Sequence, residues 1–140
     1  MYEIEIVNGQ KTIQGHIDLS YQNLTELPDL SNIVVTGKFY CHNNNLTSLY
    51  GAPKSVGGNF HCHNNNLTTL QGAPQSVGGG FHCYNNKLTT LQGAPKSVEG
   101  NFYCDQFSVE DYRKYIADIE VLESVNTETK ELFGEMIATL

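Results

Sequence analysis

The sequence predicts a small repeat solenoid of the α+β class, with a parallel sheet, an N-terminal β-hairpin cap and a C-terminal helical cap. Three observations predict it. The middle of the chain repeats with a fixed period of 21 residues, each repeat holds one short stretch of alternating apolar residues, and both ends of the chain break the pattern. A fixed period of about 20–50 residues is typical of a solenoid or array.

The N-terminal segment, MYEIEIVNGQKTIQGHIDL, predicts a hairpin. Apolar and polar residues alternate on both sides of Asn8-Gly9, and Asn-Gly is the dipeptide favoured in a two-residue type I′ turn. We expect this hairpin to cover the first edge of the solenoid core.

The repeat unit is V-x-G-x-F-x-C-x-x-N-x-L-T-x-L-x-G-A-P-x-S, and a degenerate earlier copy begins at Ile13 with a step of 22 residues to the next. G-x-F-x-C predicts a short strand whose Phe and Cys face inward. Because parallel strands stack about 4.8 Å apart, equivalent residues form columns. The G-A-P stretch is expected on an extended convex side, and the glycine pairs at 57–58 and 78–79 are expected to permit the corner into the next strand. The predicted asparagine ladder consists of Asn44, Asn65 and Asn86.

The unit F-x-C-x-x-N-x-L-x-x-L resembles the leucine-rich repeat consensus over residues 13–106, with Phe and Cys at the first two Leu positions. The short repeat with Pro and Ser is similar to the bacterial effector type, and G-A-P-x-S-V-G-G is similar to repeat proteins encoded by tailed phages and prophages. The resemblance implies a concave protein-binding surface. A phage origin would imply a host bacterial protein as partner, inhibition of a defence or metabolic enzyme as role, and the host cytoplasm as location.

The pattern ends after Cys104, because Phe107 stands where the next ladder asparagine is due. Ser108-Val109-Glu110-Asp111 resembles a capping box and predicts a helix that runs to about Glu123. A second helix is expected from about Thr127. We therefore predict a solenoid with its hairpin cap over residues 1–106 and a two-helix cap over residues 107–140.

The charge distribution and the absence of known motifs narrow the function. The net charge is −7, with two acidic ends and a nearly uncharged middle, which argues against a phosphate-backbone binder because such proteins need a basic stripe. The sequence has no apolar run long enough to cross a bilayer and no signal-peptide pattern, so we expect a cytoplasmic protein.

The sequence also lacks a Ser-His-Asp order, a phosphate loop and H-E-x-x-H, so we expect neither an enzyme nor a bound cofactor. Some bacterial leucine-rich repeat effectors carry a catalytic Cys in a large helical domain, but residues 105–140 contain none.

The His61-Cys62-His63 triplet suggests a metal site or a reactive thiol. In a strand, however, the two histidines face one way and the cysteine faces the other. The four cysteines are expected to be free core residues, since neighbouring parallel strands hold them side by side and a disulfide would need a shifted backbone. Two histidines alone make a weak, open site, so no metal is expected. A metal-dependent protein remains an alternative, using the exposed patch of His42, His61, His63 and His82.

The outward residues of the predicted strands form two columns of aromatic and histidine side chains, with Asp18 and Ser20 extending them toward the N-terminus. Tyr and His give broad amphipathic contact area at low entropic cost, as binding hot spots do. We therefore predict that the concave face of the sheet binds a partner protein; self-association through this face or the acidic helices is the other alternative. The predicted binding residues are Tyr40, His61, His82 and Tyr103 in one column and His42, His63, Tyr84 and Asp105 in the other.

Overall fold

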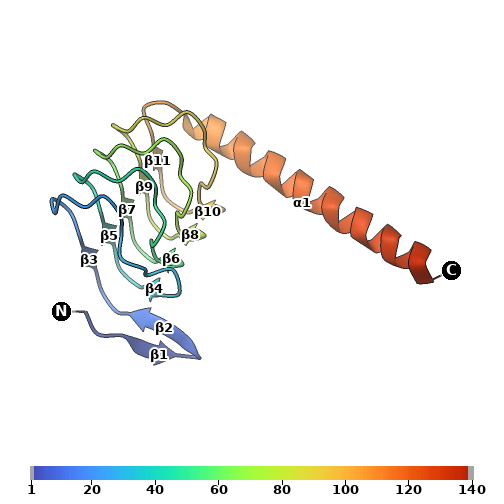
Figure 1. Cartoon of the computed structure of the whole chain (residues 1–140), viewed down its shortest axis with the longest axis horizontal. Helices are drawn as coiled ribbons and strands as arrows, with labels where there is room; N and C mark the ends of the chain where they lie inside the picture. Colours follow the sequence, from blue (N-terminus) through green and yellow to red (C-terminus); the bar gives the residue numbers. More distant parts are fainter. Residues whose placement is uncertain (1, 139–140) are drawn as a thin grey trace.

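The computed structural model describes the backbone of residues 2–138 and the side chains of residues 2–128 and 131. The chain forms a parallel β-solenoid preceded by an antiparallel hairpin and followed by one helix (Figure 1). The 21-residue step is the register of the solenoid, since Phe39 pairs with Phe60 and Phe60 with Phe81. The predicted repeat fold with its two kinds of terminal element is confirmed. Among the described residues, no helix combines the length and apolar character needed to cross a membrane.

Each turn of the solenoid contributes one strand to each of two sheets. The first, which we call the hairpin sheet, contains β1 (Glu5–Val7), β2 (Gln10–Ile13), β4 (Val34–Val35), β6 (Ser55–Val56), β8 (Ser76–Val77) and β10 (Ser97–Val98) in that order. The second, which we call the ring sheet, contains β3 (Ile17–Asp18), β5 (Phe39–Tyr40), β7 (Phe60–His61), β9 (Phe81–His82) and β11 (Phe102–Tyr103). All pairings except β1 with β2 are parallel.

The core is built from columns of identical residues, as predicted. The Phe39, Phe60 and Phe81 rings stack with centroids 5.3 Å apart at each step. Beside them, three cysteines are completely buried with free thiols, whereas Cys104 in the last turn is only partly buried. Leucines of the connecting segments and valines of the hairpin sheet fill the remaining core. The inward direction of the cysteine column is therefore confirmed; its buried members are Cys41, Cys62 and Cys83.

The predicted asparagine ladder joins consecutive turns. The Asn65 Nδ2 donates to the carbonyls of Cys41 and Cys62, both at 3.1 Å, and its Oδ1 accepts the Leu46 N–H at 3.0 Å. Asn44 and Asn86 make equivalent bonds. Each ladder asparagine thus satisfies backbone groups that would otherwise be buried without partners.

The G-A-P side of the repeat is extended, as expected, but it also forms a second parallel ladder that the sequence did not predict. The Ser-Val pairs of β6, β8 and β10 face one another in register. The glycines after them are needed for close approach rather than for backbone freedom, since Gly57 lacks a positive φ and a Cβ there would strike the Thr36 carbonyl of the preceding turn. A Cβ on Gly78 would likewise strike the carbonyl of Gly57 in the preceding turn.

The N-terminal hairpin forms as predicted, with Asn8 and Gly9 at φ 51° and 80° in the turn. Its position differs from the prediction. Only β2 contributes buried residues, Thr12 and Ile13, and it pairs with β4. All three residues of β1 are exposed, so β1 extends the hairpin sheet past the edge of the core instead of covering it.

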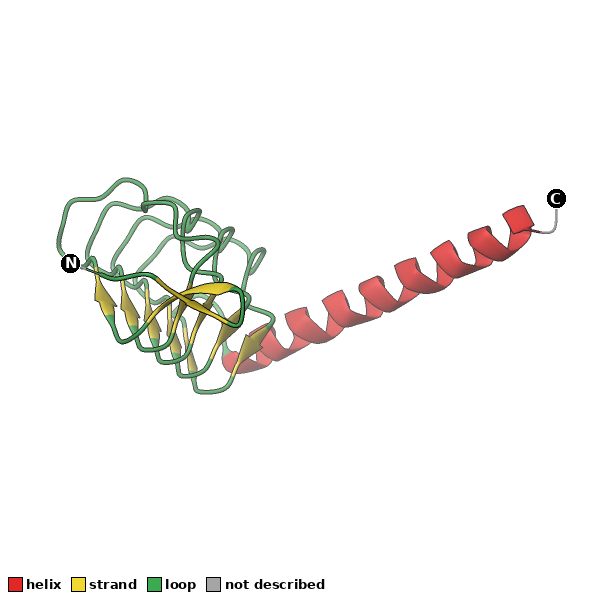
Figure 2. Ribbon diagram, turned by 90° about the horizontal axis from the view of Figure 1, so that it is seen from below, coloured by secondary structure: helices red, strands yellow, loops and turns green. Residues whose placement is uncertain are grey.

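The C-terminal segment forms one helix, α1 (Val109–Ala138), so the predicted two-helix cap is wrong (Figure 2). Thr127 was expected to begin a second helix, but it lies inside α1. Its hydroxyl donates to the Glu123 carbonyl one turn earlier at 3.0 Å and does not cap a new helix. No Gly or Pro interrupts residues 120–128. The side chains of Leu132, Phe133, Met136, Ile137 and Leu140, expected on the second helix, lie outside the described residues.

The start of α1 caps the solenoid. The predicted capping box is present, because the Ser108 N–H donates to Asp111 Oδ2 at 2.8 Å and the Asp111 N–H donates to Ser108 Oγ at 3.1 Å. The Tyr112 ring stacks on Phe102 with centroids 4.6 Å apart and so continues the phenylalanine column. Beyond its first turns, the helix extends away from the solenoid (Figure 1).

Candidate partner-binding face

The predicted site residues lie on the outer face of the ring sheet. Strands β5, β7, β9 and β11 each consist of an inward Phe followed by an outward Tyr or His, because successive residues of a strand point to opposite faces. The parallel register aligns these outward residues as one column. Consecutive ring centroids along it are 4.9, 4.2 and 4.6 Å apart. The column consists of Tyr40, His61, His82 and Tyr103.

A second column follows two residues later in each turn. His42 stacks on His63 and His63 on Tyr84, both with centroids 4.5 Å apart. Asp105 does not continue this stack. Its carboxylate accepts the Asn85 N–H at 2.8 Å, where a backbone carbonyl accepts in the earlier turns.

The two columns also contact each other. His61 meets His63 at 5.5 Å and His42 at 5.8 Å, with interplanar angles of 69° and 58°. Stacking along the columns and tilted contacts between them are the favourable arrangements for aromatic rings. The result is one continuous surface, which we call the ring surface, of Tyr40, His42, His61, His63, His82, Tyr84 and Tyr103.

Sequence reasoning missed one neighbour of this surface, Tyr21. Its ring lies 5.7 Å from His42 in an edge-on contact and its backbone has φ 57°. Asn43, in the next turn, has φ 56°, so Tyr21 occupies the position that later turns give to a left-handed asparagine. The 22-residue step of the degenerate first copy aligns these two residues and is the signal that could have identified it.

The histidines of the ring surface are neutral at pH 7. Burial, and after it repulsion from the neighbouring imidazoles, lowers the pKa of His61 and of His63 to about 4. Burial also lowers the pKa of His42 and of His82. At the N-terminal end of the columns, hydrogen bonds from the Ser20 hydroxyl and N–H hold the pKa of Asp18 below its usual value. Asp18 is therefore an anion next to His42.

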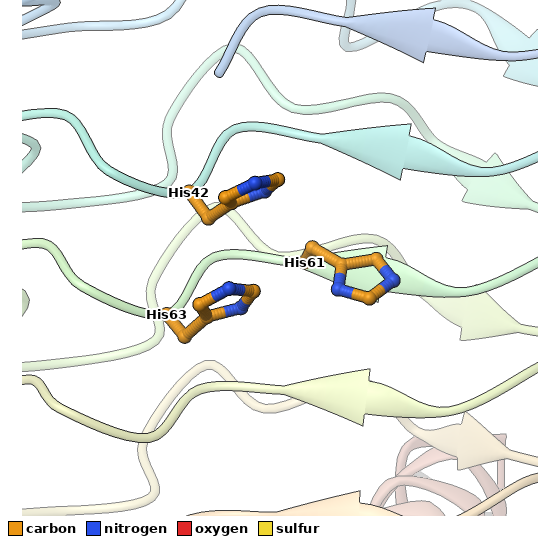
Figure 3. A group of neighbouring side chains, drawn as sticks. All are labelled: His42, His61 and His63. Carbon is orange, nitrogen blue, oxygen red and sulfur yellow. The ribbon is translucent and has the colours of Figure 1, made fainter. Parts of the chain in front are cut away.

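The structure brings together three potential metal ligands. The ligand nitrogens of His42, His61 and His63 all lie within 4.8 Å of one another (Figure 3). The Nδ1 atoms of His42 and His63 are buried and have no hydrogen-bond partner. Cys62 points into the core, as predicted, and does not join this cluster.

Cys104 differs from the other cysteines. A hydrogen bond from the Cys83 thiol lowers the pKa of Cys104 to about 7. Burial raises the pKa of Cys41 and of Cys62. Cys104 is thus the thiol with the largest thiolate fraction near neutral pH, whereas the cysteines of the core are inert.

The ring surface is therefore a continuous set of stacked aromatic side chains whose imidazoles are neutral at pH 7. No family model matches the sequence, and comparison with curated proteins and with solved structures gave no significant match.

Proposed function

We propose that this chain binds a partner protein through the ring surface. The observation that carries the proposal is the continuity of seven rings across four neighbouring strands, each touching the next. Tyr84 and Tyr103 expose 39% and 45% of their surface, so the rings are open to a partner. Exposed aromatic surfaces of this extent are typical of interaction sites.

The arrangement favours tight binding for two reasons. The rings are already stacked, so a partner would not need to order them, and little side-chain entropy is lost on association. The surface also carries no ion pair that a partner would have to break. Within the part of the chain that the structure describes, the salt bridges are Lys96–Glu123, Arg113–Glu110 and Lys114–Asp118, all of which involve α1.

The resemblance to leucine-rich repeat proteins of tailed phages and prophages supports a host bacterial protein as the partner. Inhibition of a defence or metabolic enzyme in the host cytoplasm would then be the biological role. This step rests on analogy at the level of the repeat, because function belongs to the site and not to the fold.

The test compares ring variants with a matched surface control. Tyr40→Ala, His61→Ala, His82→Ala and Tyr103→Ala are each compared with the wild type in capture from bacterial lysate, followed by calorimetry against the captured protein. An aromatic anchor at the centre of an interface contributes about 2–4 kcal/mol, so we expect a roughly 30- to 1000-fold loss of affinity for at least one variant. Gln75→Ala, exposed on the opposite side of the repeat, should change affinity by less than about threefold. Full affinity in all four ring variants, each folded by circular dichroism, would refute the proposal.

Self-association is a second candidate function, favoured by the free edge of β1. This strand pairs on one side only and exposes Ile6 and Val7. A free edge with apolar side chains can pair with a second copy. Light scattering over a concentration series tests this candidate: a mass that doubles with concentration and is returned to that of one chain by Ile6→Lys would support it. A constant mass of one chain would exclude it.

A further inference from the structure

The ring surface contains a compact group of three imidazoles that partner binding does not require. His61 and His63 are two residues apart and point to the same face, and His42 comes from the neighbouring turn directly beside His63 (Figure 3). Two histidines at i and i+2 and a third from the adjacent turn of the solenoid bring three ligand nitrogens close together. The sequence analysis placed these three histidines in one exposed patch with His82, and the structure brings the ligand nitrogens of His42, His61 and His63 within 4.8 Å of one another.

A second observation indicates that this group is incomplete as it stands. The Nδ1 atoms of His42 and His63 are buried and have no hydrogen-bond partner. Buried side-chain nitrogens nearly always have a partner, and an orphan in a native structure calls for an unseen ligand, ion or water. Two such orphans in one cluster, on stacked rings, suggest the same missing group for both.

Three imidazole ligands suit a borderline divalent cation. Zn²⁺ binds His nitrogen at about 2.0–2.1 Å in tetrahedral geometry, so ligand nitrogens in a filled site are about 3.3 Å apart. The ligand nitrogens now lie within 4.8 Å of one another, so the side chains must rotate to bring them closer. The ion must lie near the plane of each ring, so His42 and His63 would also turn out of their parallel stack, in which the planes differ by 12°.

The surrounding charges are compatible with a cation. The Asp18 carboxylate lies close enough to His42 to attract a positive charge there, whereas the His82 imidazole and Lys38 oppose charge on His61. The imidazoles are neutral at pH 7, which is the form that binds metals.

We propose that His42, His61 and His63 bind one Zn²⁺ ion, with the fourth coordination position open to the outer face of the ring sheet. Three histidines with one open position is the pattern of a site that also binds water or an external ligand. This inference does not depend on the existence of a protein partner.

The test is calorimetric titration of the tag-free chain with ZnCl₂ at pH 7.5, together with histidine side-chain NMR of the wild type. We expect one ion per chain and a change in the imidazole signals of His42, His61 and His63. His42→Ala, His61→Ala and His63→Ala should each weaken binding by about 100-fold or more, since each removes one of three ligands. His82→Ala should change it by less than about threefold, although its ring stacks directly on His61.

Two further measurements keep the test decisive. Cys104→Ser tests the partly exposed thiol, and loss of binding in that variant would assign the ion to sulfur and overturn the proposal. Circular dichroism of each variant confirms folding, and the NMR titration needs no variant. Absence of zinc binding tighter than about 0.1 mM, a weak limit for a three-ligand site, or equal losses in the His82 variant, would also overturn it. Neither result would bear on partner capture, which is measured with EDTA present.

Discussion

The imidazole of His61 stacks on that of His82 with centroids 4.2 Å apart and 10° between the ring planes. Tyr40 stacks on the other face of His61, and Tyr103 stacks on the other face of His82. This packing is favourable for neutral imidazoles and unfavourable for two imidazolium ions, because like charges at this distance repel and burial removes their hydration. Protonation of the histidines of the ring surface is therefore expected to lower the free energy of unfolding.

The stability of the chain should fall as the pH is lowered from 6.5 to about 4. An unfolded histidine has a pKa of about 6.5, whereas His61 and His63 in the fold have pKa values of about 4. Across this window the unfolded state binds more protons, so acid favours unfolding. Allowing for solvent screening of partly exposed rings, we expect the two histidines to contribute about 1–2 kcal/mol of this loss. The measurement is urea denaturation at several pH values with EDTA present.

The control is the double variant His61→Asn/His63→Asn. It removes the two titrating rings, so the fall in unfolding free energy between pH 6.5 and 4 should be smaller than in the wild type. Carboxylates titrate in both proteins and cancel in the comparison. An identical pH dependence in the two proteins would show that the rings remain protonatable in the fold.

The asparagine ladder allows a matched pair of variants at adjacent positions. Asn44 is buried, and its Oδ1 accepts the N–H groups of Gln22 and Leu24 at 3.0 and 2.9 Å. Asn44→Ala leaves these donors without a partner and should lower the unfolding free energy by about 2–4 kcal/mol. Asn45 is exposed, and Asn45→Ala should change it by less than about 0.5 kcal/mol. Chemical denaturation of both variants measures the difference, and equal effects would contradict the ladder.

The cysteine column should tolerate apolar residues but not hydroxyls. Cys62 and Cys83 are fully buried between apolar neighbours. Cys62→Ser/Cys83→Ser buries two hydroxyls and should cost about 2–5 kcal/mol, whereas the corresponding double Ala variant should be milder. Cys104→Ser, at a partly exposed position, should be nearly neutral. Thermal unfolding by circular dichroism gives the comparison, and an unchanged midpoint in the double Ser variant would mean that the column is not core.

The parts of the fold that the sequence predicted correctly are those that repetition defines. Each Phe, Cys and Asn of the unit occurs at the same position in successive turns, so one period determines the register, the inward face and the ladder together. The ring stacks follow from the same register. The second ladder was missed because Pro and Gly lie close on either side of each Ser-Val pair, and these residue types predict a turn or loop and not a strand.

The errors fall where the period ends. Asp105 is aligned with Tyr84, but no further turn follows, and its carboxylate accepts the Asn85 N–H instead of joining the column. Thr127 is of a residue type that often caps the start of a helix, yet its hydroxyl donates to the Glu123 carbonyl inside a continuous helix. Side chains that can either cap a backbone or bond within it have two local solutions, and residue type alone does not choose between them.

The first turns of α1 should stabilise the whole solenoid, whereas its exposed middle should not. Tyr112 is buried, stacks on Phe102 and donates its hydroxyl to the Pro95 carbonyl at 2.5 Å, so it closes both the core and the last turn. Tyr112→Ala removes a buried ring and should cost about 3–5 kcal/mol, by comparison with other large aromatic truncations. Tyr112→Phe keeps the stack, loses one hydrogen bond and should cost about 1 kcal/mol.

Val121→Ala is the matched control on the same helix. Val121 exposes 61% of its surface, so its truncation should change the unfolding free energy by less than about 0.5 kcal/mol. Deletion of residues 107–140 would uncover the last turn and should cause aggregation, because solenoids need capped ends. The measurement is denaturant unfolding for the point variants and light scattering for the deletion. A truncated chain that stays monomeric and as stable as the wild type would show that α1 is not a cap, and the cost of Tyr112→Ala would then have to arise within the helix itself.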